Sequence, residues 1–309
     1  MPDLKGSIRR ALADEYLGVA LGNFADSYRA SRARAYQGVD FEAVRARIAE
    51  RKGAAAGHLE ELASEFARNA EARGAKVFRT SDPEEVKRYI AGVAEASGAR
   101  RIVKSKSMAS EEIHLNPYLE SRGFDVSETD LGEWILQLAG ERPSHMVMPA
   151  IHMTREQVAD IFSKEVNERL SSDIPRLVKV ARRELREKFL GAEVGISGAN
   201  AAVAETGSLV IVTNEGNARL VTTLPHTHIA IVGIEKLVER FDDIVPILTA
   251  LPRSATGQLL TSYVSILTGA VPNTDGSPKD LHIILMDNRR SEMARDPQFR
   301  QALQCIRCA

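Results

Sequence analysis

The spacing of hydrophobic and polar positions predicts helices over the first part of the chain. Residues 41–72 carry apolar side chains three and four positions apart, the spacing of a helix with one buried face. Gly53 and Gly57 are expected to divide this stretch into two helices. The residues before it alternate small, basic and apolar side chains, and we expect residues 1–40 to form a helical extension packed on a larger body.

A repeating strand–helix pattern follows. Short apolar runs predict strands at residues 75–80, 100–105 and 124–129. After the first of these, Asp82 suits a helix cap, Pro83 the first helical position and Gly98 the helix end. Further helices are expected at residues 108–122, 154–166 and 173–191. Thr154 and Gln157 have the spacing of a capping box. This alternation predicts an α/β fold with a mostly parallel sheet covered by helices.

From residue 193 the composition shifts toward glycine, asparagine, threonine and small apolar residues. The expected elements here are strands at residues 208–213, 228–233, 261–269 and 281–287, and a helix at residues 235–241. Gly216 suits the turn that follows the first of these strands, because glycine accepts positive φ. We therefore predict one α/β domain over residues 41–300, preceded by the helical extension.

Composition narrows the classes of function. Of the 309 residues, 44% are hydrophobic and 27% are charged, as in a globular protein with a sizeable core. The formal net charge of −1 gives no general electrostatic reason to expect nucleic acid or an anionic membrane as a partner. Charges interrupt the N-terminal residues too often for a signal peptide or a membrane span. Two cysteines make no disulfide framework, so a reducing, cytoplasmic location is expected.

The first candidate for chemistry is the stretch 198–217, in which Glu205 precedes Thr206 and Gly207 between two apolar runs. A carboxylate at a strand end is able to act as nucleophile or general base, with backbone N–H groups stabilising an oxyanion. The alternative is that Glu205 caps a turn or pairs with a core arginine. The ligand-binding candidates of this stretch are Asn200, Thr206, Gly207, Asn214, Glu215, Gly216 and Asn217.

Two further clusters suit an anionic group. Arg253, Ser254, Thr256 and Gly257 are expected between a helix and a strand, where backbone and hydroxyl donors are able to cradle an anion. Lys104 and Lys106 follow a predicted strand in a similar way. The alternative for both clusters is a solvated loop. The sequence has neither the phosphate-binding G-x-x-x-x-G-K pattern nor a G-x-G-x-x-G after a strand.

Histidines give a weaker signal. His226 and His228 would share one face of a strand, where they suit a metal, a core carbonyl or a ligand carboxylate. No H-x-x-x-H or nearby cysteine supports the metal. His145 and His152 are equally compatible with structural and ligand-facing roles.

The two cysteines, Cys305 and Cys308, form a C-x-x-C close to the end of the printed sequence. This pattern suits a redox dithiol, half a zinc site, or the start of the iron–sulfur run C-x₂-C-x₂-C-x₃-C-P. A cluster needs four thiolates, so two cysteines do not complete one. Exposed thiols oxidise readily, so a missing continuation explains the pattern better than a frayed terminus.

These segments together resemble a known family, the lactate utilisation iron–sulfur proteins, which carry a LUD domain and form one component of a lactate-oxidising complex. The segments that carry the resemblance are KSKSMASEEIHLNPYLESRG, GEWILQLAGERPSHMVMPAIH, GANAAVAETGSLVIVTNEGNARL, HIAIVGIEKLV, PRSATGQ, DNRRS and ALQCIRC. They occur in the family's order and extend from about residue 40 to the end.

The resemblance implies a fold similar to that of sugar isomerases and coenzyme A transferases. It also implies a C-terminal ferredoxin-like region with two [4Fe–4S] clusters, in which Cys305 and Cys308 would be the first two ligands. Residues 301–309 would then begin a domain that this chain lacks, so no complete cluster is expected here. Family members take part in the oxidation of L-lactate to pyruvate, and this protein would pass electrons onward.

The implied partners are the other subunits of the complex and a small carboxylate substrate, and an oxidoreductase complex is expected. Two alternatives stay open. One is acyl transfer with Glu205, as in coenzyme A transferases, and the other is a non-catalytic scaffold that docks partners.

Overall fold

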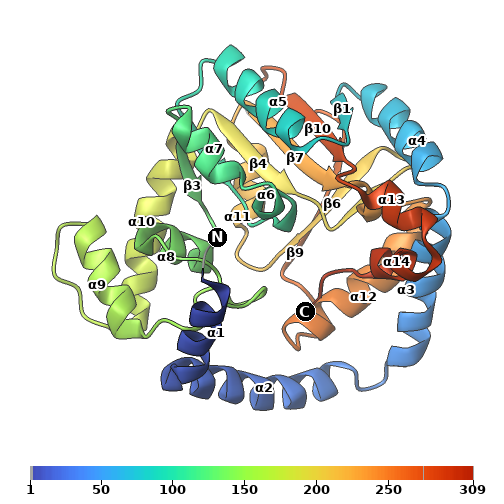
Figure 1. Cartoon of the computed structure of the whole chain (residues 1–309). Coiled ribbons are helices and arrows are strands. Elements are labelled where there is room, and N and C mark those ends of the chain that lie inside the picture. The colour runs from blue at the N-terminus through green and yellow to red at the C-terminus, as the bar shows by residue number, and fades with distance from the viewer. Residues whose placement is uncertain (1–2, 274, 309) are drawn as a thin grey trace.

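The centre of the molecule is a six-stranded sheet in which every neighbouring pair of strands is parallel (Figure 1). The computed structural model describes residues 3–273 and 275–308. The strand order is β1 (Lys76–Thr80), β10 (Asp280–Met286), β7 (Thr227–Gly233), β4 (Val194–Gly198), β2 (Arg101–Lys104) and β3 (Asp125–Glu128). This arrangement confirms the predicted α/β fold with a mostly parallel sheet covered by helices.

One face of this sheet is covered by α5 (Pro83–Ala96), α6 (Met108–Glu112) and α7 (Leu115–Ser121). Helix α5 starts where the sequence predicts, because the Asp82 carboxylate accepts the Glu84 N–H at 2.8 Å and Pro83 stands at the first helical position. Apolar side chains of α5 and α7 share one buried cluster with Ile229 and Ile231 of β7. Strands buried on both faces explain the continuous apolar runs in the sequence.

The other face is covered toward β2 by α8 (Leu131–Ala139), α9 (Arg155–Glu165), α10 (Ile174–Gly191) and α11 (Asn217–Thr223). Thr154 and Gln157 form the predicted capping box, with reciprocal bonds of 3.2 and 2.8 Å. Trp134 of α8 lies against Phe162 of α9, with ring centroids 5.0 Å apart. These contacts hold α8 and α9 beside the ends of β2 and β3.

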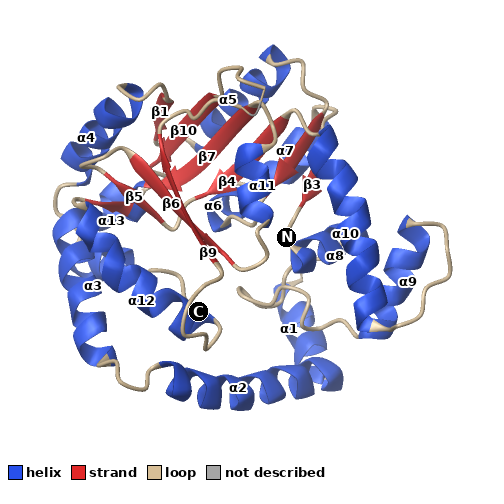
Figure 2. Cartoon of the chain, turned by 180° about the vertical axis from the view of Figure 1, so that it is seen from behind, coloured by secondary structure: helices blue, strands red, loops and turns tan. Residues whose placement is uncertain are grey.

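A second, smaller sheet covers the same face toward β7 and β10 (Figure 2). Its order is β8 (Leu237–Val238), β5 (Ala201–Val203), β6 (Ser208–Thr213) and β9 (Tyr263–Thr268). The predicted helix at residues 235–241 is wrong. Leu237 and Val238 instead pair with Ala202 and Val203 in parallel, and 3₁₀ turns at Ile234–Lys236 and Phe241–Asp243 flank them.

Three helices surround this second sheet: α3 (Phe41–Ala56), α4 (Leu59–Glu71) and α12 (Ile244–Ala255). The break between α3 and α4 falls at Gly57, and Gly53 lies inside α3. Phe66 of α4 is fully buried between this sheet and the main one. The second sheet is thus sandwiched between the main sheet and a helical layer.

Helical segments precede and follow this α/β body in the sequence. Helices α1 (Leu4–Ala13) and α2 (Glu15–Ala35) precede α3, and α2 runs along one side of the molecule. After β10 come α13 (Arg290–Arg295), α14 (Pro297–Arg300) and a 3₁₀ turn at Gln301–Gln304. The proposed domain limits, 1–40, 41–300 and 301–309, stay predictions.

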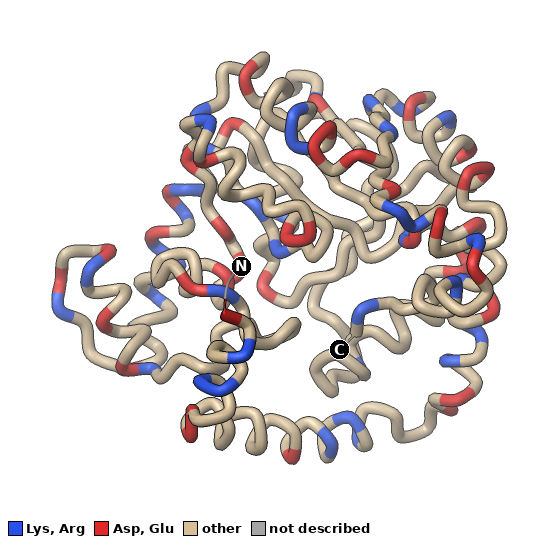
Figure 3. Tube along the Cα trace, in the orientation of Figure 1, with Lys and Arg blue, Asp and Glu red and all other residues tan. Residues whose placement is uncertain are grey.

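Acidic and basic residues are interspersed over the outer helices, and the central strands carry few of either (Figure 3). The surface therefore has the mixed charge that the sequence composition predicts. None of the described helices combines the length and apolar content needed to cross a membrane.

Phe66 and Phe299 provide a matched test of this packing. Replacing Phe66, which is 0% exposed, with alanine should lower the free energy of unfolding by roughly 3–5 kcal/mol, because the change leaves a cavity in the core. Phe299→Ala should change it by less than about 0.5 kcal/mol, since Phe299 is 58% exposed. Urea unfolding measures both. Equal effects would contradict the described position of α4.

Candidate functional site

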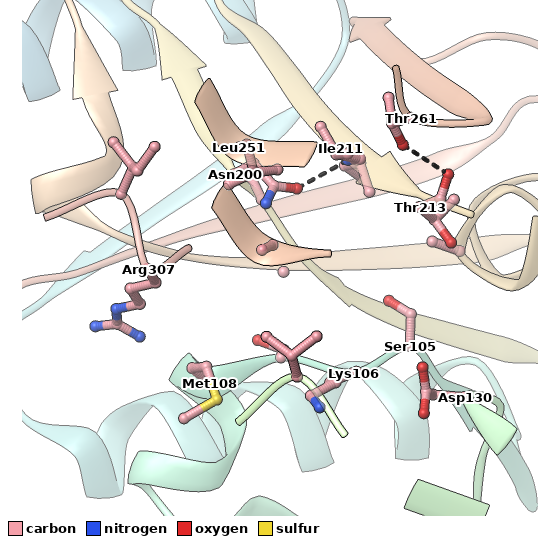
Figure 4. A pocket seen from close by; sticks show the side chains of 18 of the residues that line it. Ser105, Lys106, Met108, Asp130, Asn200, Ile211, Thr213, Leu251, Thr261 and Arg307 are labelled. Carbon is pink, nitrogen blue, oxygen red and sulfur yellow. Dashed lines mark hydrogen bonds between the residues drawn. The ribbon is translucent and has the colours of Figure 1, made fainter. Parts of the chain in front are cut away.

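A cavity of about 320 Å³ lies at the carboxyl ends of β2, β4 and β7 (Figure 4). From β2 the chain continues to its neighbour β3 on one side of the sheet, and from β4 it continues to its neighbour β7 on the other side. The direction in which successive strands are added therefore reverses between β2 and β4. Parallel α/β sheets bind ligands outside the strand ends at such a reversal. Polar lining residues are Ser105, Lys106, Ser107, Asp130, Asn200, Thr213, Asn214, Glu215, Asn217, Glu235, Lys236, Thr256, Thr261 and Arg307.

Two lysines at the end of β2 have different surroundings. Lys104 is fully buried, and its amine lies 2.7 Å from Glu128, 3.2 Å from Glu111 and 3.0 Å from the Ser110 hydroxyl. Burial lowers the pKa of Lys104, but the two carboxylates outweigh it and the pKa is raised. Lys106 instead lines the cavity. The first lysine stabilises the strand end, and the second forms part of the cavity lining beside Glu133.

Asn200 lies at the corner where the chain passes from β4 into β5. Its side-chain oxygen accepts the Val212 N–H at 2.8 Å, which fixes the orientation of the amide. Figure 4 shows the amide nitrogen turned toward the space between the sheet and the segment containing Lys106 and Met108. A side chain at Gly198 would come within 2.7 Å of the Ser107 hydroxyl, so glycine permits this close approach.

The corner after β7 carries a buried network of charges. The Glu235 carboxylate binds the Arg290 guanidinium and, at 3.1 Å, that of Arg307. Lys52 donates to the Glu235 carbonyl, and burial lowers the pKa of Lys52 to about 8. Lys236 also lines the cavity, and burial lowers its pKa while Glu235 opposes the shift. The network places Arg307 at the cavity wall, beside Lys236.

The loop between α8 and α9 forms a further wall through Met146 and Val147. Inside this loop, the Ser144 hydroxyl lies 2.7 Å from His152 Nδ1, and His152 Nε2 lies 2.8 Å from Glu141. This chain of three polar groups links the two ends of the loop. It therefore holds the wall in place without lining the cavity itself.

The rim is formed by the turn after β6, as the glycine and asparagine residues there predict. Gly216 has φ of +80° ahead of α11. Asn217 accepts the Thr213 hydroxyl at 2.9 Å, and Asn214 donates to Gln258 at 2.9 Å. Glu215 is exposed at the rim. These bonds tie the rim to the end of α12.

Residues 63–286 match the LUD domain family, a range that contains all six strands of the main sheet. The chain belongs to the LUD domain family. Lactate utilization protein B of Bacillus licheniformis is 41% identical over 308 residues, covering 99% of this chain and 64% of that protein. Its namesake in Geobacillus thermodenitrificans is 45% identical over 254 residues, covering 82% and 53%. The chain thus spans about half to two thirds of the length of these curated relatives.

A crystal structure of a DUF162 family protein from Deinococcus radiodurans, at 1.70 Å resolution, matches with a TM-score of 0.38 and 14% identity. The match covers 74% of this chain and 98% of that one.

In this LUD domain Glu205 lies outside the cavity. It follows β5 in the turn to β6, where its carboxylate accepts the Phe241 N–H at 2.8 Å. Thr206 bonds to Ser208 at 2.8 Å, and Gly207 has φ of +64° and lies directly against α4. The contacts of this turn are therefore structural in the described residues.

The sequence predicts that Arg253 and Ser254 lie between a helix and a strand, and this placement is wrong, because both residues belong to the last turn of α12. Arg253 donates to the Ala35 carbonyl at 2.9 Å. Thr256 follows the helix and lines the cavity, and Gly257 has φ of +66° where α2 approaches closely. The residues that suggested an anion site here therefore serve mainly to hold α2 against the end of α12.

The LUD domain separates the histidines. His226 is exposed before β7, at the edge opposite the cavity, while His228 is buried inside β7, 2.8 Å from the Ser197 hydroxyl. His145 accepts two backbone N–H bonds at 3.1 Å, and burial lowers its pKa, with the charge of Lys106 adding to the effect. Among the described residues, no group of three or more His, Cys, Asp and Glu side chains is placed to hold a metal ion.

Cys305 and Cys308 lie beside the cavity, because Ile306 and Arg307 between them line it. Cys305 is exposed and accepts the Arg307 N–H at 3.3 Å. Burial raises the pKa of Cys308, and Cys305 adds to the shift. Thiolates are the correct donors for a [4Fe–4S] cluster, but two of the four are present in the sequence, so these residues do not fit a complete cluster.

The cavity residues Ser105, Asp130, Lys236 and Arg307 were not among the candidates predicted from the sequence. The first three follow β2, β3 and β7 within two or three residues. In a parallel sheet such residues meet at one edge, so their position after predicted strands was a usable signal. Arg307 gave no such signal, because its place depends on Glu235, far away in the sequence.

The buried His228 predicts a specific pH dependence of stability. Burial lowers its pKa to about 3, compared with 6.5 for the ordinary group. Between these values the unfolded chain binds the proton and the folded chain does not, so stability falls as pH falls from about 6.5 to 3.

The contribution is roughly 1.4 kcal/mol per pH unit for one proton. Unfolding of the wild type and of His228→Gln, measured across this pH range, should show a shallower slope for the variant. Parallel slopes would contradict the prediction.

Proposed function

We propose that this chain acts in lactate utilisation, as a subunit of a complex that oxidises L-lactate to pyruvate. The extent of the LUD domain match and the names of relatives that are 41% and 45% identical support this role. The partners would be the other subunits of that complex, in the cytoplasm. The substrate would be a small carboxylate.

The finer proposal is that electrons leave through iron–sulfur clusters to which Cys305 and Cys308 contribute. The observation that carries it is the position of these cysteines, since Ile306 and Arg307 between them form part of the cavity wall. A substrate in the cavity would therefore lie next to the two thiols. The remaining cluster ligands would come from outside these residues, and we derive no step through the cluster.

No contact among the described residues favours the alternatives. Acyl transfer would need Glu205 at a substrate cavity, but this exposed residue lies outside the cavity, and its carboxylate accepts the Phe241 N–H. A scaffold that only docks partners would not require buried charges around a cavity, such as those at Glu235 and Lys236.

Deleting the gene in its native host tests the proposal. Growth on L-lactate should stop while growth on glucose continues, and the unaltered gene should restore it. Cys305→Ser with Cys308→Ser should fail to restore growth. The protein isolated anaerobically from the host should show a reduced [4Fe–4S] signal in electron paramagnetic resonance, and the double variant should lack it.

Normal growth of the deletion strain on L-lactate would contradict the role in lactate utilisation. Full restoration by the double serine variant would contradict only the electron-transfer part. Phe299→Ala, an exposed change in the same C-terminal region, serves as the matched control and should restore growth.

A further inference from the structure

Lys106 has a buried amine without a hydrogen bond. Its nitrogen is inaccessible to solvent and lies 3.2 Å from Glu133 Oε1, in a geometry that makes an ion pair but no hydrogen bond. Burial raises the pKa of Glu133, and the charge of Lys106 opposes this shift. A buried ammonium group normally uses its three protons. Lys104, two residues earlier, donates hydrogen bonds to Ser110 and Glu111 beside its ion pair with Glu128. Among the described residues Lys106 has one ion pair and no hydrogen bond, so it has donors left for another group.

Asn200 provides a second uncommitted donor across the cavity. Its oxygen is used by the Val212 N–H, and its amide nitrogen makes no hydrogen bond within the part of the chain that the structure describes. In Figure 4 this nitrogen faces the segment that carries Lys106. Lys106 follows β2 and Asn200 follows β4, so the two donors flank the point at which the strand order reverses.

The cavity lining carries both acidic and basic side chains, which differ in how far they are engaged. Each acidic lining residue is already engaged: Asp130 accepts two N–H bonds of α8, Glu215 accepts the Thr213 hydroxyl, and Glu235 binds two arginines. Lys236, by contrast, is only 8% exposed, and its amine has neither a hydrogen bond nor an ion pair to any described residue. Lys236 is thus a basic group at the cavity wall that no described side chain pairs with.

The shape of the lining limits the size of a ligand. Apolar side chains from several elements also line the cavity, and they are Met146, Val147, Ile211, Leu251 and Ile306. A volume of about 320 Å³ is at the small end of ligand pockets. A short carbon chain would contact this apolar wall while a polar head meets the donors.

We propose that Lys106 and Asn200 together bind the carboxylate of a short-chain 2-hydroxy or 2-oxo acid. Lys236 would lie near the oxygen on the second carbon of this acid. The choice of acid rests on the proposed function, because lactate and pyruvate are the substrate and product named there. The donor geometry itself rests only on the cavity. The carboxylate would complete the hydrogen bonds that Lys106 and Asn200 lack.

Calorimetric titration of the purified chain with L-lactate and with pyruvate tests the inference, with propionate as an acid that has no oxygen at its second carbon. Both oxygenated acids should bind saturably and more tightly than propionate. Lys106→Met keeps the unbranched shape and most of the length of the side chain and removes its charge. It should weaken binding at least about tenfold, the loss expected for a hydrogen bond to a charged group.

Asn200→Asp is the sharper variant. Aspartate keeps the oxygen that accepts the Val212 N–H, so the fold should be retained, but it replaces the donor by a negative charge that repels a carboxylate. Binding should be lost while the melting temperature stays near that of the wild type. Lys179→Met, which removes an exposed lysine of α10, is the matched control and should bind as the wild type does.

Wild-type affinity in both Lys106→Met and Asn200→Asp would overturn the assignment, and so would an absence of saturable binding of either acid to the wild type. These outcomes are separable from a failure of the proposed function. If the deletion strain cannot grow on lactate but the chain binds neither acid, only this inference fails. If the chain binds and the strain grows normally, only the proposed function fails.

Discussion

The architecture depends on one constraint, which is that two neighbouring parallel strands continue directly into a second sheet. Strand β4 ends at Gly198 and β5 begins at Ala201, while β7 ends at Gly233 and β8 begins at Leu237. Because β5 and β8 must pair with each other, both connections have to leave the main sheet at the same level along the paired strands β4 and β7. The short connections leave the side chains between them, including Asn200, at the base of the cavity.

This constraint brings charges into a buried corner, where they have to balance. Arg290 lies between Glu235 and Glu112, the latter at 2.7 Å, and Arg307 completes the coordination of Glu235. Removing one partner of such a buried set costs roughly 3–5 kcal/mol, because an uncompensated charge remains. The buried charges of this corner are therefore stable only when all of their partners are present. Lys106 and Lys236 lie outside this set, and their amines make no hydrogen bond to the described residues.

Local signals explain which elements the sequence predicts well. Asp82 and Pro83 start α5, and the Thr154 capping box starts α9, because each acts on its own helix end. The second sheet was not predicted as a separate layer, since an apolar run looks the same in either sheet. The helix expected at residues 235–241 failed for a related reason. The pairing of Leu237 with Ala202 overrides a local helical preference.

The residues of the cavity also divide into those that local sequence signals predict and those that depend on distant contacts. Lys106 was singled out because it follows a predicted strand, and Asn200, Asn214 and Asn217 because they belong to the stretch 198–217; all four line the cavity. Arg253 was singled out for its residue type, but its partners come from α2, which no local pattern reveals. Sequence spacing thus places side chains at the ends of strands. The choice between binding a ligand and holding the fold depends on contacts between distant segments.

Helix α2 links two cavity walls that are otherwise separate. Near its start, Tyr16 reaches the Met153 carbonyl at 3.3 Å, and Phe24 packs edge-on against His145. At its other end, the Tyr36 hydroxyl lies 2.7 Å from that of Ser254 in α12. A helix that lines no part of the cavity therefore determines how far apart its walls stand. Evolution is able to retune the size of the accepted ligand through the length and docking of this helix, while leaving every residue that would touch the ligand unchanged.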